Sequence, residues 1–315
     1  MWQDEFHTLL ESEDGQEVAR ASAIKEANLP EVICKYRAPN ENAIQNLRDD
    51  TIWLSPPSQF NDPYDTSLSV DAGPAMAEIL RRGFESRPLP SLDKAQMNKV
   101  VTSADPIGES SFCLADLGKI TTPQAEQLQG MARQAHEKFT HDISVLGTEK
   151  FQESMKVCSF TTLPLSMGMW SHYGDQHRGF CVLYSSSRLD AGIRQHLYPV
   201  TYTPQRFSLA AHFLRFVKAE GRGPLPGANQ LLSAAIRKSP DWSYEKEWRL
   251  VFFDDAHPSG LAFPMPTPTA IYLGAKMPSK VRRDILEIAA NKGIACSDVA
   301  LSDASFELLT SPVSS

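Results

Sequence analysis

The sequence predicts an α+β fold. Short segments with strand character are dispersed among segments with helical spacing, and they do not form the regular alternation of a βαβ repeat. The sequence contains no P-loop and no GxGxxG motif. Of the 315 residues, 42% are hydrophobic and 22% are charged, which is an ordinary composition for a globular protein. A chain of this length forms one large domain or two domains of average size.

Charge and cysteine content narrow the class of protein. The net charge of −7 argues against a protein held on nucleic acid by bulk attraction to phosphates, and leaves room for a local basic groove. The five cysteines show no CxxC spacing, so we expect reduced thiols that bind no metal. The acidic start has no apolar signal core, and no run approaches ~18 apolar residues. We therefore expect a cytoplasmic protein without a membrane partner.

The first half of the chain predicts a helical lead-in, two strands and a helical insertion. The lead-in covers residues 1–30 and ends at Pro30, which stops a helix. The expected strands are 32–37 and 51–54, with a helix between them, and the insertion contributes helices around 75–84, 92–101 and 123–140. The chain then divides into a lead-in at 1–30 and one α+β domain at 31–315, with a helical insertion at about 71–155.

The second half continues the irregular mixture of strands and helices. Apolar and β-branched runs predict strands, and amphipathic spacing predicts helices. The expected strands are 156–161, 180–184, 197–202 and 270–274, and the expected helices are 207–219, 228–238 and 279–291. The tail from residue 310 is expected to be loose.

Residues 240–253 combine a strand with a pair of carboxylates. The second half of this stretch is apolar, aromatic and β-branched, which suits a strand buried on at least one face. On a strand, Glu245 and Glu247 would point to the same side, and carboxylates that close push their pKa values apart. In the alternative interpretation, both carboxylates cap the entrance of a strand and pair with Lys246, Arg249 or solvent.

Two polar loops are interpreted as structure. Asn61-Asp62-Pro63 is typical of a turn whose Asx side chains bond their own backbone. His172, Asp175 and His177 fall in a glycine-containing loop, and their spacing matches no zinc pattern. No metal site is therefore predicted from these residues.

Four motifs in a fixed order resemble a known family. They are Lys35-Tyr36-Arg37, Phe60-Asn61-Asp62-Pro63-Tyr64-Asp65, Met169-Trp170-Ser171-His172-Tyr173 with Gly179-Phe180, and Tyr244-Glu245-Lys246-Glu247-Trp248-Arg249. Together they resemble the bacterial domain-of-unknown-function family 2971 over roughly residues 32–275. The name of that family assigns no chemistry.

A second resemblance is to the ADP-ribosyltransferases. These enzymes place an Arg or His on an early strand, a Ser, Thr or Tyr on a middle strand, and a Glu on a late strand, often as Glu-x-Glu. Arg37, Ser159 and Glu245-Lys246-Glu247 follow this order, without the Ser-Thr-Ser of the arginine-specific enzymes. The resemblance implies split, curved β-sheets around a central cleft, on which Arg37, Ser159 and Glu247 converge. It also implies NAD as the substrate and a protein or nucleic acid as the acceptor of ADP-ribose.

The resemblance further implies roles for single residues. Departure of nicotinamide builds an oxocarbenium-like cation on the ribose, which Glu247 would stabilise while Glu245 deprotonates the acceptor. Arg37 would hold the pyrophosphate, and an aromatic ring would stack on the nicotinamide. The expected catalytic residues are Glu247, Glu245 and Ser159, and the expected NAD-binding residues are Arg37, Tyr36, Trp170, Tyr173 and His172.

Two other functions fit the same residues. One is a non-enzymatic binding module in which Glu245 and Glu247 form structural ion pairs. The other is a phosphodiester-cleaving enzyme in which Asp62, Asp65 and Glu247 hold a divalent metal. For an ADP-ribosyltransferase, the expected setting is a toxin, an effector delivered into another cell or a phage-defence component, with an inhibitory or immunity partner.

Structural interpretations of single residues also stay open. Arg37 is also interpreted as a surface cation or as the partner of Asp62. Trp170 and Trp248 are equally interpreted as core aromatics. Ser159 on its own is an ordinary strand residue.

Overall fold

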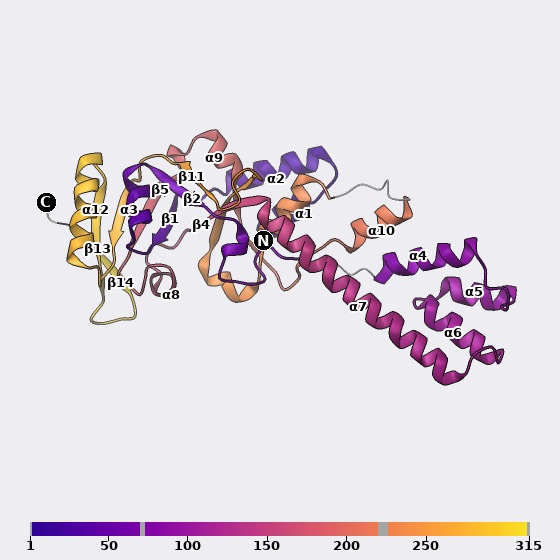
Figure 1. The fold of residues 1–315 in the computed structure, drawn as a ribbon. Coiled ribbons are helices and arrows are strands. Elements are labelled where there is room, and N and C mark those ends of the chain that lie inside the picture. Colours follow the sequence, from indigo (N-terminus) through magenta and orange to yellow (C-terminus); the bar gives the residue numbers. More distant parts are fainter. Residues whose placement is uncertain (1, 70–72, 220–225, 314–315) are drawn as a thin grey trace. The chain divides into compact units, whose positions relative to one another are not determined.

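The computed structural model describes residues 2–69, 73–219 and 226–313 (Figure 1). Contacts divide the chain into two compact units. Unit 1 comprises Met1–Thr66, Phe151–Gln205 and Leu232–Ser315, and unit 2 comprises Ser67–Lys150 and Arg206–Leu231. Unit 2 combines most of the insertion expected at 71–155 with a second segment, so two units stand where the sequence predicts one domain at 31–315.

Unit 1 is built on an open eight-stranded sheet. In sheet order the strands are β14 (Leu308–Pro312), β13 (Ala295–Leu301), β12 (Ala270–Leu273), β5 (Phe180–Ser185), β1 (Val32–Arg37), β4 (Met155–Thr161), β10 (Glu247–Phe253) and β6 (Leu197–Pro199). Neighbouring strands are antiparallel except for the parallel pair β12 and β13. The open sheet with interspersed helices confirms the mixed class of fold predicted from the sequence.

Alternation along two central strands separates a core face from a polar face. On β10, Trp248 and Leu250 belong to the main apolar core, so their neighbours Glu247 and Arg249 point to the opposite face. On β4, Phe160 belongs to the same core, which turns Ser159 and Thr161 to the polar face. Cross-strand pairing of Glu247 with Thr161 and of Arg249 with Ser159 brings these four residues together.

The helices of unit 1 carry recognisable start and stop residues. The lead-in forms α1 (Trp2–Leu10) and α2 (Gly15–Ala27), the latter capped by the Asp14 side chain. Asn40 caps α3 (Glu41–Arg48) and Ser166 caps α8 (Met167–His172). The C-terminal helix α12 (Ser279–Lys292) ends at Gly293, whose φ of 66° is left-handed. The remaining short helices are η1 (Pro57–Gln59), η2 (Ser186–Arg188), α9 (Ala191–His196) and η3 (Pro240–Glu245).

Several boundaries differ from the sequence-based expectation. The helix expected at 228–238 ends early as α11 (Ala228–Ala235), because β9 (Arg237–Lys238) pairs with β7 (Thr201–Tyr202). The strand expected at 197–202 is divided between β6 and β7, which lie in different sheets. Strands β13 and β14 form where none was predicted, and β14 includes the start of the tail expected to be loose. A further two-stranded sheet pairs β2 (Thr51–Leu54) with β11 (Leu261–Pro264).

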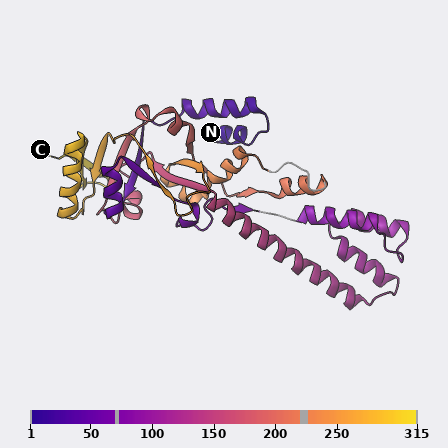
Figure 2. The same cartoon turned by 45° about the horizontal axis from the view of Figure 1, so that its top comes forward.

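Unit 2 is largely helical. Its helices are α4 (Gly73–Ser86), α5 (Lys94–Thr102), α6 (Pro106–Asp116), most of α7 (Thr122–Glu153) and α10 (Ala210–Lys218). The short strands β3 (Leu68–Ser69) and β8 (Phe207–Ser208) pair in parallel. Helix α6 was not among the helices expected from the sequence. It begins at Pro106, where proline is tolerated as the first helical residue, and Asp105 caps it. Figure 2 shows α7 as one continuous helix, much longer than the expected 123–140.

None of the helices in the described part of the chain is both long enough and apolar enough to cross a lipid bilayer.

Candidate functional site

A cavity of about 170 Å³ opens in unit 1 between β1 and β4. These strands share the single register pair Cys34–Thr161, whereas β1 pairs with β5 along its whole length. The cavity therefore lies where the ladder between two central strands stops. Its lining consists of Cys34, Lys35, Tyr36, Phe60, Asn61, Asp65, Ser159, Phe160, Thr161, Met169, Tyr173, Lys238, Glu245 and Glu247.

Buried ion pairs form the polar wall of the cavity. Arg249 is 0% exposed, and its two terminal nitrogens each donate to a carboxylate oxygen of Asp65 at 2.6 Å. Its Nε donates to Glu247 Oε1 at 2.8 Å. The Nζ atom of Lys238 lies 2.7 Å from Glu245 Oε2 and 3.0 Å from Glu247 Oε2. Two cations, Arg249 and Lys238, thus pair with three buried carboxylates. Loss of any one partner would leave a buried charge without its ion pair, which is costly in free energy.

The carboxylate of Glu247 is held by cationic donors. A carboxylate offers about four acceptor positions. Three of them accept hydrogen bonds from the Nε and Nη2 atoms of Arg249 and from the Lys238 ammonium. Burial raises the pKa of Glu247, but Arg249 and Lys238 outweigh burial and hold it well below the ordinary value of 4.5. Glu247 is therefore a fixed anion that anchors two cations.

Glu245 has different surroundings although it is only two residues away. Its Oε1 accepts a hydrogen bond from the Tyr173 hydroxyl at 2.6 Å, and its Oε2 faces Lys238. Burial raises the pKa of Glu245, the Lys238 ammonium lowers it, and the neighbouring Glu247 carboxylate raises it. The resulting pKa lies above the ordinary value of 4.5. With these two donors assigned, Glu245 retains acceptor capacity toward the cavity.

The chain geometry that delivers Glu245 differs from the expected strand. Glu245 is the last residue of η3, and Lys246 has a left-handed φ of 47° before β10 begins. The Thr161 hydroxyl donates to the Glu245 carbonyl at 2.5 Å and fixes this turn. The two carboxylates therefore meet at Lys238 because of a backbone reversal, and not because they alternate on one strand.

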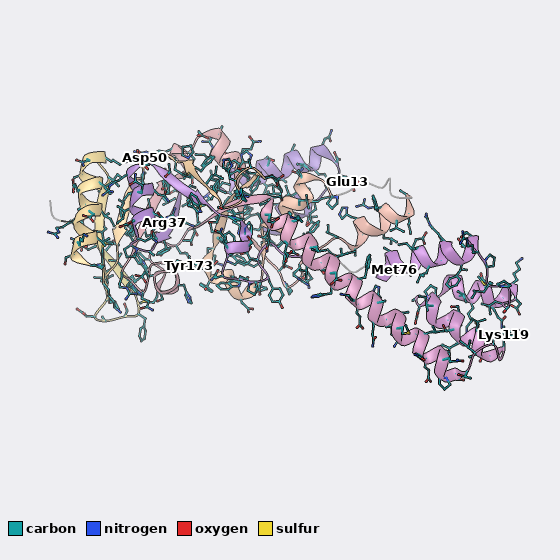
Figure 3. All side chains as sticks on the ribbon, viewed as in Figure 1. Glu13, Arg37, Asp50, Met76, Lys119 and Tyr173 are labelled. Atoms are coloured by element: carbon teal, nitrogen blue, oxygen red, sulfur yellow. The ribbon has the colours of Figure 1, made fainter. Side chains whose placement is uncertain are left out.

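Lys35 lies in the cavity wall, where Arg37 was expected from the sequence. The Lys35 Nζ atom donates to the Ser159 carbonyl at 2.7 Å, and burial lowers its pKa. Arg37, at the end of β1 (Figure 3), is not among the described residues that line the cavity. Ser159 and Glu247 both line the cavity, whereas Arg37, the last residue of β1, does not join them at the lining.

Helix α8 supplies one aromatic residue to the cavity and keeps another in the core. Tyr173, labelled in Figure 3, follows α8 and lines the cavity. Trp170 is 0% exposed, packs edge-on against Tyr36 at 5.1 Å and donates to the Pro164 carbonyl. The structure therefore places Trp170 in the core and not at the cavity surface, whereas Tyr36 does line the cavity. His172 is exposed outside the lining, with its ring 6.3 Å from Tyr173.

A strained turn follows α8. Asp175, Gln176 and His177 all have positive φ, at 48°, 54° and 68°. Three consecutive non-glycine residues in this region are unfavourable, and such strain is kept only where surrounding contacts over-determine it. The contacts here include the bond from the Lys276 amide to the His177 carbonyl at 2.8 Å. The turn fixes the end of α8, and hence Tyr173.

Comparison with known protein families identifies this part of the chain. Residues 169–250 match the family described as "Protein of unknown function (DUF2971)". The match confirms the family resemblance over these residues, which include Tyr173, Lys238, Glu245, Glu247 and Arg249. No curated protein and no solved structure gives a match.

The buried ion pairs disfavour the metal-dependent alternative. Arg249 binds both Asp65 and Glu247, so a guanidinium lies where a divalent cation would need to be. The Asp62 Oδ1 atom accepts from the Tyr64 amide and belongs to a turn. Within the described residues, no group of His, Cys, Asp and Glu could hold a metal ion.

Two charged residues of the site were missed by sequence reasoning. Lys238 was assigned to the end of a helix, and its role depends on β9 pairing with β7. Lys35 was passed over because Arg37 fits the ADP-ribosyltransferase pattern. Arg249 was named as a possible pairing partner of the carboxylates, and the structure shows its ion pair with Glu247. The available signal was the series of charged residues flanking apolar strands, since buried charges in proteins are paired.

Proposed function

We propose that the protein transfers ADP-ribose from NAD to a macromolecular acceptor, with the chemistry at the cavity between β1 and β4. The observation that carries this proposal is the pairing of two buried carboxylates, Glu245 and Glu247, at the wall of a cavity lined by aromatic rings. A carboxylate stabilises an oxocarbenium-like cation, and a second carboxylate of raised pKa suits proton transfer. The opening in the ladder beside β4 agrees with the split sheet that the resemblance implies.

The cavity volume suits one ring of the substrate. An apolar cavity of about 150 Å³ binds benzene, so about 170 Å³ accommodates a nicotinamide ring. Sites for drug-sized ligands span roughly 300–1,000 Å³, which leaves the rest of NAD outside. The rings of Tyr36, Phe60 and Tyr173 line the cavity and provide the aromatic faces that a flat cationic ring prefers.

The geometry divides the work between the carboxylates. In the transfer reaction, the bond between the ribose C1′ and the nicotinamide nitrogen breaks, and nicotinamide leaves with the bonding electrons. The acceptor nucleophile then forms the new bond to C1′ and gives up its proton. Glu245, with spare acceptor capacity and a raised pKa, is the group to take that proton. Glu247 contributes fixed negative charge and holds Lys238 and Arg249 in place.

The test is nicotinamide release when the purified protein is mixed with NAD and cell lysate. Glu245→Gln should abolish transfer per folded molecule, because glutamine keeps the shape but cannot accept the proton. Because burial raises the Glu245 pKa above 4.5, wild-type activity should increase as the pH rises through that raised value. A Glu245→Gln protein with wild-type turnover would overturn the assignment.

Glu247→Gln separates anchoring from catalysis. Glu247 anchors two buried cations. Its replacement by glutamine should therefore lower the free energy of unfolding by several kcal/mol, because one charged partner of a buried network is removed. The measurement is melting temperature and nicotinamide release on the same preparation. A lowered melting temperature with full turnover per folded molecule would show that Glu247 stabilises the fold and takes no part in catalysis.

One observation favours a second candidate, a non-enzymatic binding module. Arg249 and Lys238 together donate three hydrogen bonds to Glu247, as in a structural ion-pair network. In that case a ring-sized ligand would bind in the cavity and no nicotinamide would form. Binding of nicotinamide without turnover of NAD, in the presence of lysate, would select this candidate.

A further inference from the structure

A row of aromatic rings leads away from the cavity. We name it the aromatic ledge and define it as Tyr173, His172, Tyr244 and Trp242. The ring centroids of successive members are 6.3, 6.4 and 6.3 Å apart. Tyr173 lines the cavity at one end, so the ledge is continuous with the proposed nicotinamide site.

The ledge is held in place by the elements beneath it. His172 and Tyr173 come from the end of α8, and the other two rings come from η3. The two elements are in contact beside Gly168, where a Cβ would lie 3.8 Å from the Tyr244 ring, an ordinary van der Waals distance. The ammonium of Lys238 lies over the Trp242 ring, 4.7 Å from its centre. One face of Trp242 is thus occupied.

Two members of the ledge are open to a ligand. Tyr244 is 39% exposed, and His172 is exposed as well. Large exposed rings held in a fixed row are typical of surfaces on which flat rings stack, and stacking of a nucleobase on an aromatic side chain is sequence-tolerant and substantial. The free ring faces of the ledge therefore suit a flat heterocycle.

We infer that the aromatic ledge binds the adenine ring of NAD, with Tyr244 and His172 as the stacking surface. This inference rests on the proposed function, because it takes NAD as the substrate. The cavity of about 170 Å³ holds one ring and not a dinucleotide, so the adenosine part must lie outside it. The ledge begins at the cavity and offers the stacking faces that the second ring of NAD requires.

Binding of ADP tests the ledge without any turnover. The probe is ADP, titrated by calorimetry into the full chain. Loss of one stacking partner is worth about 1–3 kcal/mol per base, which converts to a rise in Kd of about 5-fold to 150-fold at 1.4 kcal/mol per tenfold. Tyr244→Ala and His172→Ala should each show such a rise, whereas Tyr244→Phe, which keeps the ring, should bind ADP as the wild type does.

A matched control is Phe253→Ala. Phe253 is 47% exposed and lies at the opposite end of β10 from Glu247. Removal of this exposed ring should leave ADP binding unchanged. Equal ADP affinity in wild type, Tyr244→Ala and His172→Ala would overturn the inference, as would an equal loss in Phe253→Ala.

A second experiment compares the KM values of two substrates, NAD and nicotinamide mononucleotide. Nicotinamide mononucleotide carries the nicotinamide and ribose of NAD but lacks the adenosine. Tyr244→Ala should raise KM for NAD at least 5-fold and leave KM for nicotinamide mononucleotide unchanged. An equal rise in both KM values would overturn the adenine assignment while leaving the proposed function intact. If the wild type binds ADP through the aromatic ledge but releases no nicotinamide, the proposed function is wrong, and the ledge remains a binding site for adenine.

Discussion

At the scale of single residues, Glu245 and Glu247 have the same side chain and opposite pKa shifts. Both face Lys238, but Glu247 also binds the Arg249 guanidinium, and Glu245 accepts from a neutral hydroxyl. A positive partner stabilises the ionised form, whereas burial destabilises it. The assignment of roles at this site thus depends on one guanidinium.

Arg249 is expected to be a principal stabiliser of unit 1. Arg249→Leu leaves the buried carboxylates of Asp65 and Glu247 without their partner and should lower the free energy of unfolding by about 3–5 kcal/mol. Arg249→Lys keeps the charge but loses the two-pronged contact with Asp65, so its loss should be smaller. Urea unfolding measures both variants.

Two further variants complete this test. In Arg249→Leu combined with Asp65→Leu, the loss should be less than the sum of the single losses, because the pair is removed together. Lys138→Ala, at an exposed ion pair whose Lys138 side chain is 77% exposed, should change stability by no more than about 0.5 kcal/mol. Wild-type stability of Arg249→Leu would mean that the network does not hold the unit together.

At the scale of elements, short irregular segments place the site. The left-handed Lys246 between η3 and β10 turns Glu245 toward Lys238. The left-handed turn at 175–177 fixes the end of α8. Gly179 is required beside that turn, because a Cβ there would lie 2.0 Å from the Arg37 carbonyl oxygen. These segments connect strands to the cavity, and each depends on backbone that most side chains disfavour.

Strain in the turn after α8 predicts the outcome of changes at Gln176. This residue is exposed and has a φ of 54°, so its side chain can be replaced without loss of packing. Gln176→Val should lower the free energy of unfolding by about 1–2 kcal/mol, because a β-branched residue fits the left-handed region poorly. Gln176→Gly should not lower it, because glycine adopts this conformation freely. Chemical denaturation compares the variants, and a Val variant as stable as the Gly variant would show that the turn is not strained.

At the scale of the whole molecule, the chain forms two units, and each contains buried apolar residues. Val157 lies in unit 1 and is 1% exposed, and Val100 lies in unit 2 and is 0% exposed. Unit 2 is made from two insertions in the sequence of unit 1. A chain with separate cores unfolds in more than one step when the cores are energetically independent.

Matched Val→Ala substitutions test this independence. Each removes about two methylene equivalents from a core and should destabilise its unit by about 2 kcal/mol. In calorimetry, we expect Val157→Ala to lower the transition of unit 1 alone, and Val100→Ala to lower the transition of unit 2 alone. A single transition that both variants lower equally would show that the units unfold as one.

The sequence by itself determined the class of fold, the positions of most central strands and the resemblance to the DUF2971 family that the match at residues 169–250 supports. These features depend on local periodicity and on short motifs, which neighbouring residues specify. Strands β1, β4, β5, β10 and β12 fall where apolar and β-branched runs predict them, and the family match covers two of the four motifs that carry the resemblance. The carboxylate pair at 245 and 247 was also evident from the sequence.

Only the tertiary structure decided which charged side chains meet. Lys35 is far in the chain from Lys238 and Arg249, and the three strands that carry these residues are brought to one cavity by strand order and pairing. Arg37 stays outside the cavity lining, and Trp170 lies in the core. The physical reason is that a buried charge needs partners from other segments as well as from its own, and local sequence patterns do not show which segments become neighbours.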